Sequence, residues 1–83
     1  MFLHLGGNTI VHTKDVIAIL NAENRAEEQW AVHSVRYALG ERQVKRIGED
    51  AKAVVVTTDA VYISPISSNT LRKRAEFLAD LGE

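Results

Sequence analysis

The sequence contains no cysteine, so neither disulfide bonds nor thiolate metal sites can stabilise the fold. It has a single proline, Pro65, and it has no apolar run near the roughly 20 residues that a membrane-spanning helix needs. The start "MFLHLGGNTIV" has no basic flank and no small-residue cleavage site, so it is not predicted to be a signal peptide. We therefore expect a cytoplasmic protein without a membrane partner.

An excess of charge of either sign is also missing, because ten Lys and Arg oppose eleven Asp and Glu and leave a net charge of −1. This balance excludes a uniformly basic protein that coats nucleic acid, so any attraction to phosphate must come from a local patch. Apolar residues make up 46% of the 83 residues, which is typical of a globular protein. We expect one domain over residues 1–83. Because so short a chain buries little surface, a homo-oligomer is expected.

The first half of the chain predicts a hairpin, a strand and a helix. Residues 2–5, "FLHL", and the Gly-Asn pair before "TIVH" are typical of a β-hairpin. Residues 16–20, "VIAIL", are rich in β-branched side chains and predict a buried strand. Asn24 as N-cap, Glu27 three residues later and Gly40 as C-terminal stop predict a helix between them.

This helix has two stripes of large or apolar side chains. The stripe expected to cover the sheet is made of Ala31, Val35 and Ala38 or Leu39. Trp30 and Tyr37 lie on the adjacent stripe. If the first stripe packs on the sheet, the two aromatic side chains are partly spare, and we predict that they form an oligomer interface.

The second half predicts three strands and a C-terminal helix. "QVKRI" is a weak strand, "GED" a turn, and "AKAVVVTTDAVYIS" two strands around a turn at residues 58–60. Three consecutive valines, residues 54–56, indicate a central strand covered on both faces. Pro65 ends the last strand, because it has no N–H to donate.

The final helix is expected to start after Ser67 or Ser68 and to end near Gly82. Its buried stripe is predicted to be Leu71, Ala75 and Leu78, with Phe77 and Leu81 beside it. The predicted fold class is therefore α+β: a small antiparallel β-sheet of about five strands with one central helix and one C-terminal helix, assembling into an oligomer such as a ring.

The stretch "SPISSNTLRKR" allows two interpretations. Its hydroxyl and amide oxygens can simply accept hydrogen bonds from the first helical turn. Arg72 and Lys73, however, are expected in that first turn, where cations oppose the helix dipole. A site that loses stability in this way is a candidate for binding phosphate or a partner's carboxylate. Both interpretations stay open.

A second basic group surrounds the predicted "GED" turn. Across a hairpin turned there, Lys45 or Arg46 would stand opposite Lys52, and like charges opposed on a strand pair need an anion or solvent. The alternative is a charged sheet edge that deters aggregation. Elsewhere, His4 and His12 lack a third ligand, and no serine has a recognisable His and acid partner. No enzyme, metal, cofactor or small-molecule substrate is predicted.

Three stretches, "FLHLGGNTIV", "KDVIAIL" and "AKAVVVTTDAVYISPISSNTLRKRAEF", resemble the bacterial extracellular matrix regulatory proteins, the RemA/RemB family, and look most like the RemB branch. The resemblance covers nearly the whole chain. It implies a non-enzymatic regulator of bacterial transcription and biofilm genes, from a family with a DNA-binding member that assembles into rings carrying DNA on a repeated basic surface. Repetition around an oligomer would add weak contacts together through effective concentration.

The pattern departs from the RemA branch at the DNA contacts. Two adjacent arginines of that branch are matched here by Glu49 and Asp50, and a third by Asp15. The DNA contacts expected instead are cations elsewhere: Lys14, Lys45, Arg46 and Lys52, with Arg72 and Lys73 as phosphate contacts at the helix start. Such contacts would position the DNA backbone without reading bases. The alternative is an oligomeric protein-interaction or structural module that does not bind nucleic acid.

Overall fold

The computed structural model describes the backbone of residues 1–82 and the side chains of residues 1–76. In chain order the elements are β1 (Phe2–Gly6), β2 (Thr9–His12), the 3-10 turn η1 (Thr13–Asp15), β3 (Val16–Asn21), α1 (Arg25–Leu39), β4 (Gln43–Arg46), β5 (Ala53–Thr57), β6 (Ala60–Ser64) and α2 (Ser68–Gly82). The α+β class and the two helices are confirmed. The strands form two sheets, a hairpin β1-β2 and a four-stranded sheet in the order β3-β5-β6-β4.

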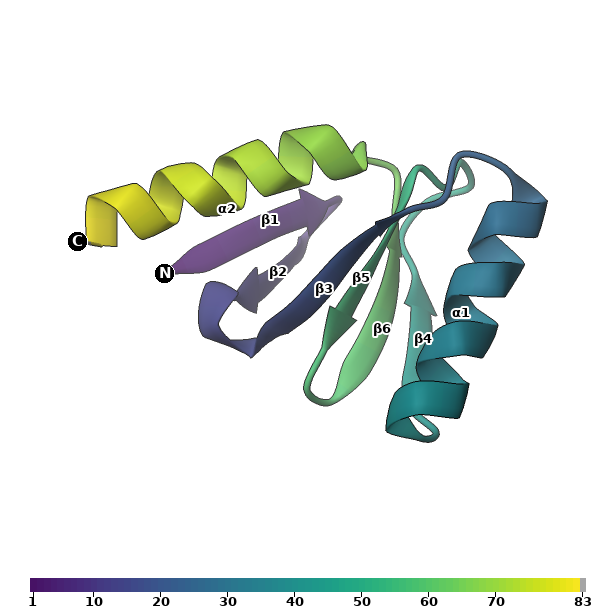
Figure 1. The fold of residues 1–83 in the computed structure, drawn as a ribbon. Helices are drawn as coiled ribbons and strands as arrows, with labels where there is room; N and C mark the ends of the chain where they lie inside the picture. Colours follow the sequence, from purple (N-terminus) through teal and green to yellow (C-terminus); the bar gives the residue numbers. More distant parts are fainter. Residues whose placement is uncertain (83) are drawn as a thin grey trace.

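The structure has three layers, with the four-stranded sheet in the middle (Figure 1). Helix α1 packs on one face, and the β1-β2 hairpin with α2 lies on the other. Each face therefore has its own apolar core. The α1 side contains Val54, Val56, Val61 and Ile63, whereas the hairpin side contains Leu3, Leu5, Val55 and Leu71.

Strand β5 lies at the centre of this arrangement. It pairs antiparallel with β3 on one edge and with β6 on the other. All five of its residues are buried, and the three valines alternate between the two cores. The prediction of a central strand covered on both faces is confirmed, because alternation along a strand sends Val55 to the face opposite its neighbours.

Strand β3 is confirmed over the predicted segment, but it is an edge strand and is less buried than expected. Its side chains are mostly half-buried, and Ile17 is exposed. The reason is its position, since only β5 pairs with it and α1 covers only part of its length. The outward-facing apolar side chain of Ile17 thus reaches the surface.

The hairpin β1-β2 is held against the sheet at one end by a buried serine. Ser64 Oγ donates a hydrogen bond to the Leu5 carbonyl oxygen at 2.6 Å and accepts one from Ile66 N–H at 3.1 Å. Beside it, Gly6 has φ +113°, and an added Cβ there would lie 3.1 Å from Pro65 Cγ. Only glycine fits this backbone and this close approach. Ser64 and Gly6 therefore fix how the hairpin crosses the end of β6.

Helix α1 is capped as predicted. Asn24 Oδ1 accepts from Glu27 N–H at 2.9 Å, and Asn24 Nδ2 donates to Glu27 Oε1 at 3.0 Å. Gly40, at φ +88°, ends the helix and donates its N–H to the Arg36 carbonyl oxygen. Ala31 and Val35 are buried as expected, but Ala38 and Leu39 are exposed. The apolar stripe is thus shorter than predicted, because the last turn of α1 lacks a covering layer.

The predicted hairpin around "GED" is wrong. Strand β4 pairs in parallel with β6, so Lys45 stands beside Tyr62 and Arg46 beside Ile63. The loop over residues 47–52 crosses the end of β6 and is hydrogen-bonded to it. Ile47 N–H donates to the Ile63 carbonyl oxygen, and Lys52 N–H donates to the Ser64 carbonyl oxygen. Both edges of β5 are already occupied by β3 and β6, which leaves no place for β4 beside it.

Helix α2 begins as the sequence predicts, with Ser67 as the cap. Ser67 Oγ accepts from Thr70 N–H at 3.2 Å. Leu71 is buried and Ala75 is half-buried, whereas the predicted contacts of Phe77, Leu78 and Leu81 lie outside the described side chains. Among the described residues, no helix is long and apolar enough to cross a bilayer.

We predict that Ser64→Ala lowers the free energy of unfolding by about 1–3 kcal/mol, because it leaves the buried Leu5 carbonyl and Ile66 N–H without their hydrogen bonds. Urea unfolding followed by circular dichroism measures this change. Ser34→Ala is the matched control, since this half-buried serine of α1 makes no side-chain hydrogen bond among the described residues, and it should change stability by less than about 0.5 kcal/mol. Equal effects of the two substitutions would contradict the role assigned to Ser64.

Candidate functional site

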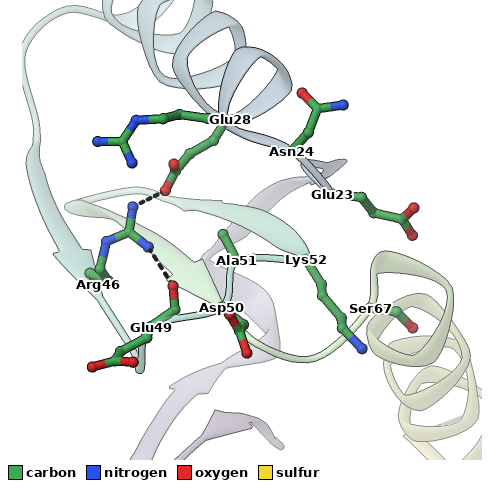
Figure 2. Close-up of a pocket in the computed structure, with 10 residues that line it drawn as sticks. Glu23, Asn24, Glu28, Arg46, Glu49, Asp50, Ala51, Lys52 and Ser67 are labelled. Carbon is green, nitrogen blue, oxygen red and sulfur yellow. Dashed lines mark hydrogen bonds and ion pairs between the residues drawn. The ribbon is translucent and has the colours of Figure 1, made fainter.

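A polar groove of about 580 Å³ lies where the first turn of α1, the loop between β4 and β5, and the start of α2 meet (Figure 2). Its lining carries four carboxylates and three cations, namely Glu23, Glu28, Glu49, Asp50, Arg25, Arg46 and Lys52. The groove is therefore balanced in charge and slightly acidic. It is not the cationic cleft that strong binding of nucleic acid would require.

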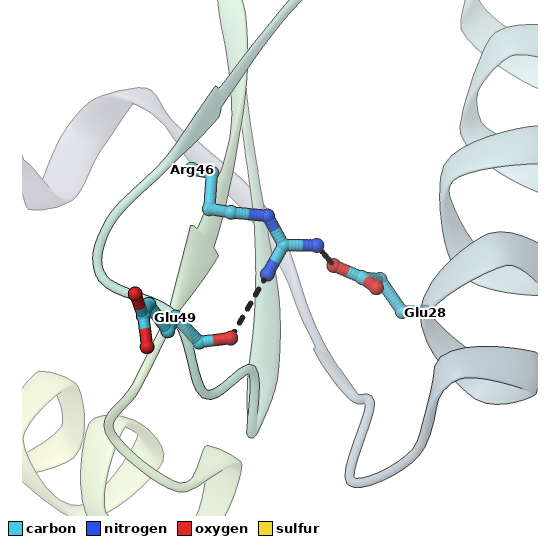
Figure 3. Close-up of polar contacts among 3 residues, drawn as sticks. All are labelled: Glu28, Arg46 and Glu49. Atoms are coloured by element: carbon cyan, nitrogen blue, oxygen red, sulfur yellow. Dashed lines mark hydrogen bonds and ion pairs between the residues drawn. The ribbon is translucent and has the colours of Figure 1, made fainter.

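The fold brings Arg46 to this groove because Arg46 alternates along β4 with Lys45 and points toward α1. Its guanidinium forms an ion pair with the Glu28 carboxylate and donates to the Glu49 carbonyl oxygen at 3.4 Å (Figure 3). Glu28 is only 7% exposed. A buried carboxylate without a countercharge lowers stability, and the Arg46 guanidinium supplies that countercharge for Glu28. Arg46, predicted to contact DNA, is thus already engaged in an ion pair within its own chain.

Lys52 is exposed and lies between the two helix starts. Figure 2 shows its side chain directed toward Ser67, the cap of α2. Among the described residues it forms no ion pair. The positive end of the α2 dipole and the Lys52 ammonium group therefore lie on the same side of the groove.

The cations of α2 are not where the sequence prediction placed them. Because α2 starts at Ser68, its first turn ends at Leu71, and Arg72 and Lys73 stand in the second turn. Arg72 reaches across to β3, where its Nη2 donates to the Ile19 carbonyl oxygen at 2.8 Å. These cations therefore do not oppose the helix dipole in the first turn, and that prediction is wrong. Arg72 caps a sheet edge instead, while Lys73 is exposed.

The other two predicted DNA contacts, Lys14 and Lys45, do not line this groove. Lys14 is exposed in η1, before β3, whereas Lys52 precedes β5. Since β3 and β5 are antiparallel, the two lysines lie at opposite ends of the pair, roughly 20 Å apart along the strands. Lys45 faces the hairpin side, with its Nζ 5.7 Å from the centre of the Tyr62 ring. The six predicted cations do not form one patch within a single chain.

The predicted interface aromatics are both on the surface, with Trp30 67% and Tyr37 90% exposed. Trp30 lines an apolar groove of about 290 Å³ between α1 and β3. Five further large apolar side chains among the described residues are exposed without having been predicted to be: Met1, Phe2, Ile10, Ile17 and Leu39. For Phe2 and Ile10 the signal was available, because they alternate with buried residues along the hairpin.

The chain matches the family model described as "Extracellular matrix regulatory protein A-like" over residues 2–75. This range includes every strand and α1, and it ends within α2. The chain belongs to the RemA-like family of extracellular matrix regulatory proteins. It is also 32% identical over 81 residues to extracellular matrix regulatory protein B of Bacillus subtilis (strain 168), covering 98% of both chains. The family resemblance predicted from the three sequence stretches is confirmed.

The groove in this RemA-like chain has one wall that is acidic. The loop between β4 and β5, which carries Glu49 and Asp50, forms one wall of this groove. The resemblance seen in the sequence predicts that these two acids replace adjacent arginines of the RemA branch. In this RemA-like chain the same loop presents negative charge beside Arg46 and Lys52.

We predict an asymmetric cost for breaking the Arg46–Glu28 ion pair. Arg46→Met should lower the free energy of unfolding by about 1–3 kcal/mol, because it leaves the buried Glu28 carboxylate unpaired. Glu28→Gln should cost less than about 1 kcal/mol, because the side chain of Arg46 is partly exposed and water can solvate it. Urea unfolding of each variant measures both values.

The double variant, Arg46→Met with Glu28→Gln, should recover part of the loss caused by Arg46→Met, which a double-mutant cycle detects. Arg36→Met is the matched control, since Arg36 pairs with Glu41 at 3.6 Å with both side chains well exposed. It should change stability by less than about 1 kcal/mol. An Arg46→Met loss no larger than the Arg36→Met loss would contradict the assigned role.

Proposed function

We propose that the chain is a non-enzymatic, cytoplasmic regulator of extracellular matrix genes, which assembles with copies of itself and contacts the phosphate backbone of DNA. Its family membership supports the regulatory role. The observation that carries the DNA contact is that two lysines are exposed and have no carboxylate partner among the described residues. They are Lys52, whose side chain is directed toward the Ser67 cap of α2 (Figure 2), and Lys73, in the second turn of α2.

The contact is weak for one chain and relies on repetition. Two lysines and the amides of one helix start can engage one or two phosphates, while Glu49 and Asp50 line the adjacent groove. If several copies present the same surface along one duplex, the second and later contacts form at a high effective concentration. Since lysine-to-phosphate contacts carry no base information, sequence preference would come from the shape of the DNA.

A second candidate function is an oligomeric protein-interaction module that does not bind nucleic acid. Two observations favour it: the ion pair that occupies Arg46, and the hydrogen bond that holds Arg72 to the Ile19 carbonyl. Both arginines are the side chains best suited to bidentate phosphate recognition, and both are engaged within the chain. In this case the surface around α2 would meet a carboxylate of a protein partner.

Fluorescence anisotropy of a labelled duplex, titrated with protein at several salt concentrations, separates the two candidates. DNA binding predicts an affinity that falls steeply with salt, with a slope of about 0.9 per phosphate neutralised. Lys52→Gln with Lys73→Gln should weaken binding about tenfold or more and reduce the slope by about 1 or more per chain engaged.

The matched control is Lys14→Gln with Lys45→Gln, which makes the same change in net charge at positions away from the start of α2. It should retain most of the salt slope. Equal losses from both pairs would show a dependence on net charge and not on the proposed surface. No binding by the unmodified chain even at low salt would favour the protein-interaction module.

A further inference from the structure

A groove of about 340 Å³ between α1 and β4 carries an excess of positive charge. Helix α1 contacts chiefly β5 and β3, so it leaves this hollow beside the edge strand β4 (Figure 1). The charged side chains that line the hollow are Arg25, Arg36, Arg46 and Glu28. This arginine groove therefore has three guanidinium groups and one carboxylate, whereas carboxylates outnumber cations in the polar groove described above.

Two of the three guanidinium groups are available to a ligand. Arg46 neutralises the buried Glu28 carboxylate, and Arg25 forms no ion pair among the described residues. Arg36 pairs with Glu41 at 3.6 Å, but both side chains are well exposed, and such a pair contributes so little stability that an anion can replace Glu41. Arg25 and Arg36 are roughly 16 Å apart along the helix axis, a spacing that suits an extended ligand with repeated negative charges.

Three aromatic rings form a stripe beside this groove on α1. Trp30, His33 and Tyr37 are spaced three and four residues apart, so they lie on one side of the helix and extend along it for roughly 10 Å. All three are exposed, Tyr37 to 90%, and His33 also lines the arginine groove. The aromatic stripe therefore continues the surface that the arginines begin.

Helix α1 places no free acid on this surface. Its two acids are Glu27 and Glu28. Glu28 is buried, whereas Glu27 lies on the β3 side of Trp30 and accepts a hydrogen bond from the Asn24 cap. Cations beside exposed aromatic rings are the combination with which proteins bind single-stranded nucleic acid, because the cations follow the phosphates and the rings stack on the bases. In a duplex the bases are already stacked on one another.

We propose that α1 binds single-stranded nucleic acid, with the phosphates in the arginine groove and the bases stacked on the aromatic stripe. This site goes beyond the duplex contact of the proposed function, because it uses neither Lys52 nor Lys73 and lies on the opposite face of the sheet from α2 (Figure 1). Single strands of DNA and of RNA share the chemistry that the site recognises. Stacking and phosphate contacts do not read base identity, so binding tolerates many sequences.

The intrinsic fluorescence of the chain reports on this site directly, because Trp30 is its single tryptophan. Titration with an oligothymidylate of about 12 nucleotides should quench the Trp30 emission as bases stack on the ring, and the anisotropy of the labelled oligonucleotide should rise in parallel. The logarithm of the affinity should fall linearly with the logarithm of the salt concentration. An oligouridylate of equal length compares RNA with DNA.

Two variants separate the phosphate contacts from the stacking contacts. Arg25→Gln with Arg36→Gln should weaken binding about tenfold or more and lower the salt slope by about 1.4, since each lost phosphate contact removes about 0.7. Tyr37→Ala should weaken binding about fivefold or more and leave the salt slope unchanged, because it removes a stacking partner and no charge.

The matched control is Lys45→Gln with Arg74→Gln, which makes the same change in net charge on the hairpin side of the sheet and on α2. It should keep most of the affinity, the full quenching of Trp30 and the salt slope. All these side chains are exposed, so each variant should retain the circular dichroism spectrum of the unmodified chain.

Four results would overturn the proposal. The first is the absence of binding by the unmodified chain at low salt. The second is a rise in anisotropy without quenching of Trp30, or full affinity in the Arg25 and Arg36 variant, because the strand would then lie elsewhere. The third is equal affinity and quenching with an oligoglutamate of the same charge, which would assign the surface to an acidic protein segment. The fourth is a Tyr37→Ala variant with a lower mass by light scattering, which would place Tyr37 in the predicted oligomer interface.

Discussion

Burial of β5 on both faces is the constraint on which the rest of the structure depends. A strand with valines pointing to both sides needs a covering layer above and below the sheet, and 83 residues must supply both. Helix α1 provides one layer, and the hairpin with α2 provides the other. So short a chain cannot also cover the outside of these layers. The exposed apolar side chains of α1 and the hairpin are therefore a consequence of how the central strand is enclosed.

The local elements could be predicted from the sequence because short-range chemistry specifies them. The valine run, the Asn24 and Ser67 caps, and the stop at Gly40 are each determined by residues within a few positions. The pairing of β4 with β6 could not be predicted in this way. A loop of six residues is compatible with a hairpin, and only the occupation of both edges of β5 excludes it. That occupation depends on β3, which is distant in sequence.

The sequence predicted which cations belong to the candidate site. It could not predict which of them are already paired within the chain. The partner of Arg46 is Glu28, 18 residues away, and the partner of Arg72 is a backbone oxygen 53 residues away. Neither partner can be recognised from a sequence pattern. Both contacts depend on residues that are distant in the sequence and are brought together only by the fold. Lys52 and Lys73 remain exposed. The charge available on the surface around α2 is therefore smaller than a count of the basic residues in the sequence suggests. The family relationship was readable from the sequence, since it rests on long continuous stretches.

The parallel pairing of β4 with β6 also limits the order in which the sheet can assemble. Strand β4 is made before β6 during synthesis, yet β6 is its neighbour in the sheet, and the two pair in parallel. The hairpin of β5 and β6 can form locally within microseconds, whereas β4 must wait for it with its polar edge in water. Strand β4 can therefore take its place in the sheet only once β6 is present, and its lysine and arginine are charges of the kind that discourage an unpaired strand from pairing with other chains.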